Sequence, residues 1–150
     1  MDRPAFVLAS TSDRYDLAWE AERLAAIPGF RFELRPGAPA TEQDMIDLAR
    51  DADALLVSSR EPVGRDVMDR MERCKVIGRY AVGLDNIDLD AAAERGIVVT
   101  HYPMYCTAEV ADHALASILA LNRRIVQFDR DLRRGAWTQH AHHMLSLIHI

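Results

Sequence analysis

Short apolar runs and amphipathic segments alternate along the first hundred residues of the chain. The segments with helical spacing are residues 15–27, 41–51, 63–71 and 88–95, and the apolar runs between them are AFVLAS (5–10), FRFELR (30–35), ALLVSS (54–59), Val76–Tyr80 and IVVT (97–100). This alternation is typical of a parallel sheet covered by helices. The pattern therefore predicts an α/β protein with a parallel sheet of about five strands.

Local signals place the ends of two of these helices. Thr41 stands three residues before Asp44, the spacing of a capping box at a helix start. Asp88 is a suitable N-cap for the helix that follows it, and Gly96 is a suitable left-handed stop at the end of that helix.

The segment from Thr107 to Arg134 contains neither glycine nor proline, so a single helix of about 28 residues is possible there. Apolar residues recur along it at steps of three and four, which predicts one continuous apolar seam: Ala114, Ile118, Leu121, Ile125, Phe128 and Leu132. A second apolar row, formed by Ala111, Leu115 and Leu119, predicts burial of the first half on more than one side. The far end of the seam needs a partner that this chain does not obviously supply.

Composition narrows the function classes. Of the 150 residues, 49% are hydrophobic and 27% are charged, which is typical of a globular protein. The net charge of −5, with acidic and basic residues interspersed, provides no basic face, so nucleic acid is not expected as a partner. No apolar stretch has the length of a membrane span, and the two cysteines, Cys74 and Cys106, suggest no disulfide framework. We therefore expect a cytoplasmic protein without a membrane partner.

A turn with little side-chain bulk, Ala81-Val82-Gly83, follows the fourth predicted strand. Ligands of open parallel sheets bind beyond the carboxyl ends of the strands, where backbone N–H groups can face a small anion. The alternative is a tight strand-to-helix connection in which Gly83 supplies a positive φ. Spacing alone does not decide between the two.

The segment 76–124, with YAVGLDNID at 80–88 and YCTAEVADH at 105–113, resembles the N-terminal part of the D-isomer-specific 2-hydroxyacid dehydrogenases, including members grouped with the C-terminal binding proteins. SSREPVGRDVM at 58–68 fits the same resemblance, which extends over Phe6–Trp137. It implies a flavodoxin-like substrate domain at residues 1–106 and a long crossover helix at 107–134, leading toward a nucleotide-binding domain outside this chain. Residues 135–150 are then a tail, either disordered or foreign to the natural protein, since LSLIHI replaces the expected continuation.

The resemblance also implies a site. Backbone amides of Ala81, Val82 and Gly83 would hold the carboxylate of a small 2-oxo or 2-hydroxy acid, although many relatives have glycine in place of Ala81. Ser59 and Arg60 would contact polar substrate groups, with plain solvation of Arg60 as the alternative. Thr107 would lie near the cofactor, or would simply be the N-cap of the helix; Cys106 beside it weakens a hydrogen-bonding role.

The implied chemistry is hydride transfer with NAD or NADP in a homodimeric parent enzyme. The catalytic arginine, glutamate and histidine would lie beyond residue 150. After Gly96 the sequence has only Gly135, so it lacks the G-x-G-x-x-G needed for dinucleotide binding. This chain alone is therefore expected to bind no cofactor and to be inactive.

Three other interpretations remain open. A module like the C-terminal binding proteins would bind peptides as a co-repressor without catalysis. A free-standing FMN carrier or phosphoreceiver would share the fold, but the sequence has no matching phosphate loop or phosphoacceptor aspartate. Metal binding by four histidines near the end of the sequence is a remote possibility: His140, His142, His143 and His149. His113 is expected on a helix face.

Overall fold

The computed structural model of the chain describes residues 5–11 and 16–137 and separates two compact units, Met1–Pro103 and Met104–Ile150. In the described residues, the first unit holds a sheet with four helices, and the second holds two helices. Within the described residues, no helix combines the length and the hydropathy that crossing a membrane requires.

The sheet of the first unit is built from five parallel strands in the order β2-β1-β3-β4-β5. The strands are β1 (Phe6–Ser10), β2 (Phe32–Pro36), β3 (Ala54–Val57), β4 (Val76–Arg79) and β5 (Val98–Thr100). Each one lies within or one residue beyond a run that the hydrophobic pattern predicts. The prediction of a five-stranded parallel α/β sheet is confirmed.

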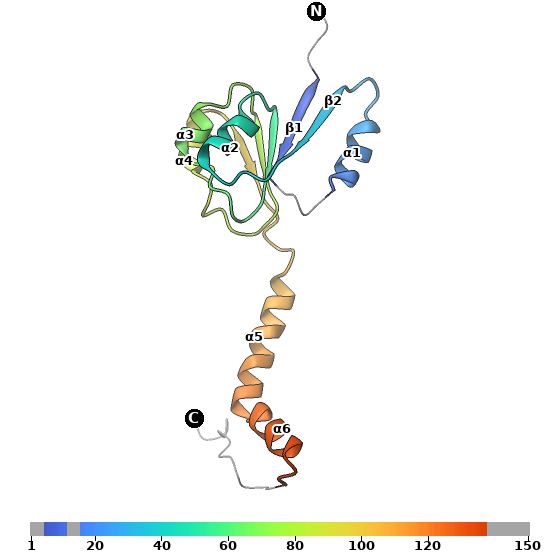
Figure 1. The fold of residues 1–150 in the computed structure, drawn as a ribbon, viewed down its shortest axis with the longest axis vertical. Helices are drawn as coiled ribbons and strands as arrows, with labels where there is room; N and C mark the ends of the chain where they lie inside the picture. The colour runs from blue at the N-terminus through green and yellow to red at the C-terminus, as the bar shows by residue number, and fades with distance from the viewer. Residues whose placement is uncertain (1–4, 12–15, 138–150) are drawn as a thin grey trace, which may run out of the picture. The chain divides into compact units, whose positions relative to one another are not determined.

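Helices alternate with the strands: α1 (Ala18–Ala25), α2 (Glu42–Ala49), α3 (Arg65–Asp69) and α4 (Leu89–Glu94). Figure 1 shows α2, α3 and α4 together on one side of the sheet, with α1 on the other side, beside β1 and β2. Strands that run parallel require such crossovers, because the chain must return to the same end of the sheet before the next strand begins.

The core lies between the sheet and the helices α2, α3 and α4. Leu55 and Ile77 from neighbouring strands are completely buried there, together with Met68 of α3 and Ala91 of α4. Successive side chains of a strand point to opposite faces, so strand residues two positions away from Leu55 or Ile77 also face the core. One of them is Arg79 of β4, a charged residue that is only 7% exposed.

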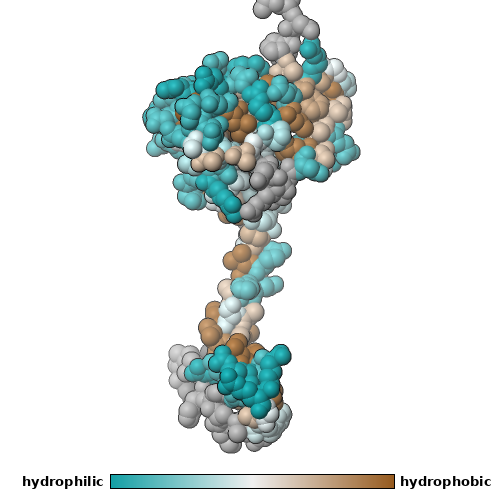
Figure 2. All heavy atoms as spheres, viewed as in Figure 1, coloured by the Kyte–Doolittle hydropathy of each residue, from teal (hydrophilic) through white to brown (hydrophobic). Residues whose placement is uncertain are grey.

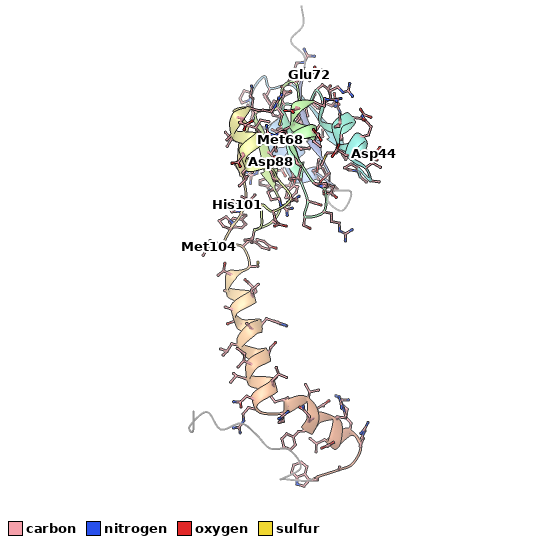
Figure 3. All side chains as sticks on the ribbon, turned by 90° about the vertical axis from the view of Figure 1, so that its left-hand side faces the viewer. Asp44, Met68, Glu72, Asp88, His101 and Met104 are labelled. Atoms are coloured by element: carbon pink, nitrogen blue, oxygen red, sulfur yellow. The ribbon has the colours of Figure 1, made fainter. Side chains whose placement is uncertain are left out.

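The predicted helix caps are present. The Thr41 hydroxyl accepts from the Asp44 N–H at 3.2 Å, and the Asp44 carboxylate accepts from the Thr41 N–H at 2.9 Å, which completes the capping box. Asp88 accepts from the Ala91 N–H at 2.9 Å at the start of α4 (Figure 3 labels Asp44 and Asp88). Gly96 has φ +66° after the end of α4, as a left-handed stop requires.

The second unit does not contain the single long helix that the absence of glycine and proline suggested. It contains α5 (Thr107–Asn122) and α6 (Ile125–Arg133), separated at Arg124, whose φ is +56°. A right-handed helix cannot pass through a left-handed residue, so the helix ends and starts again. Arginine is an uncommon residue in that conformation, and for this reason no local signal in the sequence marks the break.

The apolar residues of α5 are exposed, contrary to the expectation that its first half would be buried on several sides. Leu115 is 56% exposed and Leu119 is 42% exposed, and Asn122 alone is buried among the residues of this helix. Figure 2 shows hydrophobic residues along its surface. Of the predicted tail at 135–150, all but Gly135–Trp137 lies outside the described residues.

Candidate functional site

The turn Ala81-Val82-Gly83 leaves the carboxyl end of β4, where ligands of open parallel sheets bind. A different donor holds each of its three carbonyl groups. The Tyr102 N–H donates to the Ala81 carbonyl at 3.4 Å, and the Arg79 Nε donates to the Gly83 carbonyl at 2.9 Å. The Val82 carbonyl lies 2.7 Å from His101 Nδ1, so that nitrogen carries the proton in this contact (Figure 3 labels His101).

The amide groups of the same turn are available. Among the described residues, the N–H groups of Ala81, Val82 and Gly83 donate to no acceptor. In a trans peptide the carbonyl and the following N–H point in opposite directions. Holding the carbonyls against the protein therefore turns the N–H groups of Val82 and Gly83 the other way, and unpaired N–H groups in succession form an anion-binding nest.

Gly83 does not adopt the positive φ of the alternative interpretation. Among the described glycines, those with positive φ are Gly29, Gly96 and Gly135. A Cβ at position 83 would instead lie 2.6 Å from Asp85 Oδ1, closer than a real contact allows. Asp85 is exposed and this oxygen is the end of its flexible side chain, so the carboxylate could move aside for a larger residue.

Arg79 is a functional candidate that the sequence reasoning missed. Its side chain is almost entirely buried, and its buried Nη1 has no hydrogen-bond partner among the residues that the structure describes. A buried donor without a partner lowers the stability of the fold, and the surrounding contacts must offset this cost in free energy. The sequence does contain a signal for its burial. Arg79 is two residues from the buried Ile77, so both side chains lie on the same face of the strand.

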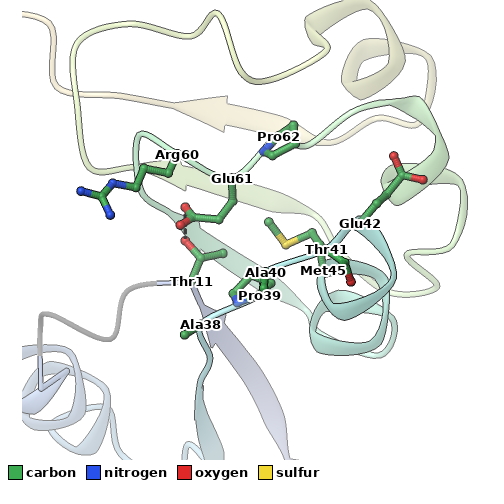
Figure 4. A pocket seen from close by; sticks show the side chains of 10 residues that line it. All are labelled: Thr11, Ala38, Pro39, Ala40, Thr41, Glu42, Met45, Arg60, Glu61 and Pro62. Atoms are coloured by element: carbon green, nitrogen blue, oxygen red, sulfur yellow. Dashed lines mark hydrogen bonds between the residues drawn. The ribbon is translucent and has the colours of Figure 1, made fainter.

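Ser59 and Arg60 lie in the loop between β3 and α3, also at the carboxyl end of the sheet. Both side chains are exposed. The Arg60 guanidinium makes no ion pair with any other residue in the described part of the chain, and Figure 4 shows it directed away from Glu61 and Thr11. An exposed, unpaired guanidinium fits both interpretations of this residue, substrate contact and plain solvation.

The neighbouring carboxylate of Glu61 has other partners. Its Oε2 accepts from the Ser58 hydroxyl at 2.6 Å and from the Thr11 hydroxyl at 3.0 Å, and Thr11 Oγ1 accepts from the Ser58 N–H at 2.9 Å (Figure 4). Burial raises the pKa of Glu61, but these hydrogen bonds outweigh it, so the pKa lies below its ordinary value. The loop is thus anchored to β1 through an ionised glutamate.

A cleft of about 410 Å³ opens between this loop and the segment that leads into α2 (Figure 4). Arg60, Glu61 and Pro62 line one wall, and residues 38–42 with Met45 line the other. At the start of α2, beside this cleft, the capping box pairs the Asp44 N–H with the Thr41 hydroxyl and the Thr41 N–H with the Asp44 carboxylate. The three turn residues do not line this cleft, and the candidate site consists of the unpaired amides of the turn.

Thr107 belongs to the second unit and is the first residue of α5. The N-cap is Cys106, which makes no side-chain capping bond, so the interpretation of Thr107 as the N-cap is wrong. The Thr107 hydroxyl contacts Met104 Sδ at 3.9 Å, a weak interaction. A role beside the cofactor stays a prediction.

The described residues contain no group of three or more potential metal ligands. His113 is exposed on α5, as expected of a helix-face residue. The remote metal hypothesis concerned His140, His142, His143 and His149, and these lie outside the described residues.

Comparisons with known sequences point to one family. Residues 12–146 match the family of D-isomer specific 2-hydroxyacid dehydrogenases, catalytic domain. D-3-phosphoglycerate dehydrogenase from Methanocaldococcus jannaschii is 40% identical over 105 residues, covering 70% of this chain and 20% of that protein. Glyoxylate reductase from Korarchaeum cryptofilum is 37% identical over 110 residues, covering 73% of this chain and 33% of that protein.

Solved structures agree with the sequence matches. The D-lactate dehydrogenase from Aquifex aeolicus, complexed with NAD and lactic acid, superposes with a TM-score of 0.69 at 26% identity, covering 90% of this chain and 39% of that one. A protein from Pyrococcus horikoshii superposes with a TM-score of 0.74 at 28% identity, covering 97% of this chain and 43% of that one. The chain spans about a fifth to a third of the length of the curated relatives named above. The parallel sheet, the glycine turn and the match over residues 12–146 together show that the chain belongs to the D-isomer specific 2-hydroxyacid dehydrogenase family.

Proposed function

We propose that this chain is the substrate domain of an NAD(P)-dependent oxidoreductase that interconverts 2-oxo acids and D-2-hydroxy acids. The observation that carries the proposal is the turn after β4, where three carbonyls are held by protein donors and the N–H groups of Ala81, Val82 and Gly83 are unpaired among the described residues. Such a turn suits a carboxylate, the group that all acids of this class share.

The family resemblance supplies the remaining roles in this proposal. Ser59 and Arg60 contact polar groups of the substrate from the β3–α3 loop. When the cofactor is bound, its nicotinamide supplies or accepts the hydride. The sequence up to Trp137 has no G-x-G-x-x-G, so the proposal places the cofactor on a separate nucleotide-binding domain, together with the catalytic arginine, glutamate and histidine. Thr107 would lie near that cofactor, and the whole enzyme would be a homodimer.

The carboxylate site is tested by titrating the ¹⁵N-labelled chain with glyoxylate while amide chemical shifts are recorded. The largest shifts are expected at Ala81, Val82 and Gly83. Glycolaldehyde, which has similar size but no carboxylate, is the matched control and should leave these amides unchanged. The proposal fails if the glyoxylate shifts centre elsewhere, for example at residues 140–143.

The division of labour between two domains is tested by calorimetry with NADH. The chain alone is expected to give no binding heat, because it lacks the glycine fingerprint that lets a pyrophosphate approach a helix N-terminus. Micromolar affinity would show that this chain carries its own cofactor site and would contradict the assignment.

A further inference from the structure

Asn86 joins the two parts of the candidate site. It lies three residues after Gly83, in the same β4–α4 connection, and its Nδ2 reaches the β3–α3 loop. There it donates to the Glu61 carbonyl at 2.7 Å and to the Ser58 carbonyl at 3.3 Å. These two carbonyls flank Ser59 and Arg60 on either side, so one amide group holds the base of the loop that presents both predicted substrate contacts.

Backbone contacts make the connection stiff. The Val63 N–H donates to the Asn86 carbonyl at 2.8 Å, and the Asp88 N–H donates to the Val63 carbonyl at 3.1 Å. Val63 and Ile87 form an isolated parallel bridge and are both buried. The DNID segment is therefore paired with the end of the β3–α3 loop, and the Asn86 side chain extends that pairing back to Ser58.

We propose that Asn86 is a positioning residue that sets the separation between the carboxylate turn and Arg60, and that it thereby favours 2-oxo acids with a second anionic group. The inference rests on the proposed function, since it takes the turn as the carboxylate site. One carboxylate of such a substrate occupies the turn, and the second anionic group meets the Arg60 guanidinium.

Two features of the loop support a role for Arg60 as an anion contact. Glu61, the adjacent carboxylate, is taken up by the hydroxyls of Ser58 and Thr11 and does not neutralise Arg60. The guanidinium itself makes no ion pair within the described part of the chain. Its charge is therefore available to a ligand, and its position depends on the loop base that Asn86 holds.

The chemistry at position 86 requires an amide. Both partners are carbonyl acceptors, so the residue must supply two N–H donors, which asparagine does and aspartate does not. Asn86 Oδ1 is buried and has no hydrogen-bond partner within residues 5–11 and 16–137. An aspartate of the same shape would place a carboxylate against the Ser58 and Glu61 carbonyls and would push the loop away.

The experiment compares two ligands on the wild-type chain and on two variants. Glyoxylate has one carboxylate, and 2-oxoglutarate has two. Amide titrations give the dissociation constant of each ligand for the wild-type chain, for Asn86→Asp and for Asn86→Ser. The serine variant replaces the two amide donors with a single hydroxyl on a shorter side chain and adds no charge. Asp88→Ala is the matched control, because it perturbs the same connection by removing the α4 cap but touches neither Ser58 nor Glu61.

We expect the wild-type chain to bind 2-oxoglutarate roughly threefold more tightly than glyoxylate, the size of effect typical of one exposed ion pair. Both Asn86 variants should lose this ratio while glyoxylate binding stays within about twofold, and Asp88→Ala should keep the ratio. A ratio that survives in Asn86→Ser, or an equal loss for both ligands, would overturn the inference. Absence of any glyoxylate response at the turn of the wild-type chain would instead overturn the proposed function.

A measurement on the wild-type chain covers the case in which the variants do not fold. The side-chain amide protons of Asn86 report directly on its two hydrogen bonds. Their chemical shifts should respond to 2-oxoglutarate and not to glyoxylate, because only the longer ligand engages the loop. Identical responses to the two ligands, or none to either, would also contradict the positioning role.

Discussion

The two units of this chain use similar aliphatic residues in opposite ways. In the sheet unit, Leu55 and Ile77 are completely buried between the strands and the helices α2, α3 and α4. In the helical unit, Ile118 is 62% exposed and Leu121 is 69% exposed. The difference is one of available partners. A sheet face buries its apolar residues against helices of the same unit, whereas most apolar side chains of α5 are exposed in the described part of the chain.

We infer that α5 carries an interaction site, since contiguous exposed apolar residues are typical of such sites. The first unit supplies its own core, so most of its folding free energy is expected to come from within the chain. The second unit has backbone hydrogen bonds and helix propensity as its local support, and these alone leave a short helix marginal in water. We infer that the two units differ in stability and in their tendency to associate.

The largest expected effect is the contrast between two leucine truncations. Leu55→Ala should lower the free energy of unfolding of the sheet unit by about 3 kcal/mol, because it leaves a cavity in a packed core. Leu121→Ala on the exposed face of α5 should change stability by less than about 0.5 kcal/mol. Urea unfolding followed by methyl NMR signals of the sheet core measures both. Equal costs would show that Leu121 is buried in solution.

The second largest expected effect is on self-association of the chain. The apolar surface of α5 should make the chain associate with increasing concentration, and Ile118→Glu should reduce that association several-fold by placing a charge in the contact. Leu89→Glu is the matched control, since Leu89 is also exposed but lies on α4 of the sheet unit. Light scattering over a concentration series gives the result. A wild-type chain that stays monomeric throughout would contradict this interpretation of α5.

A smaller effect is expected when a helix cap is removed from the sheet unit or added to the helical unit. Thr41→Ala should destabilise the start of α2 by about 1 kcal/mol, because it removes one half of the capping box. Cys106→Ser should do the opposite in the helical unit, where the N-cap makes no side-chain bond, and should slow hydrogen exchange in the first turn of α5. Hydrogen exchange at both helix starts is the measurement. No change after Cys106→Ser would mean that the backbone there does not admit a cap.

The smallest expected effect concerns pH. Because the folded pKa of Glu61 lies below its ordinary value, its ionised form stabilises the sheet unit above the unfolded pKa, and this contribution is lost as pH falls through the folded pKa. Unfolding of the sheet unit should therefore become easier below about pH 4. Glu61→Gln should flatten this part of the pH profile, while Glu72→Gln, an exposed control, should leave its slope closer to that of the wild-type chain. Identical profiles for Glu61→Gln and the wild-type chain would contradict the role of this carboxylate.

Local sequence patterns encode the order and type of the elements in the sheet unit. Alternating apolar runs predict all five strands, and Thr41, Asp88 and Gly96 mark helix ends through chemistry that involves neighbours only a few residues away. The turn at Ala81–Gly83 is visible in the sequence for the same reason: a glycine between a buried strand and a capped helix is a local signal. Its assignment to a carboxylate came from family resemblance.

Features that depend on contacts between distant segments could not be predicted from local sequence and are seen only in the tertiary structure. The hydrogen bonds from Asn86 to Ser58 and Glu61, and from His101 to the turn, join residues far apart in the chain, and no local pattern encodes them. The break at Arg124 likewise carries no glycine or proline signal. Local preferences are set by neighbouring residues, but the direction of a peptide group or a buried guanidinium such as Arg79 is set by whichever donors and acceptors the fold brings beside it.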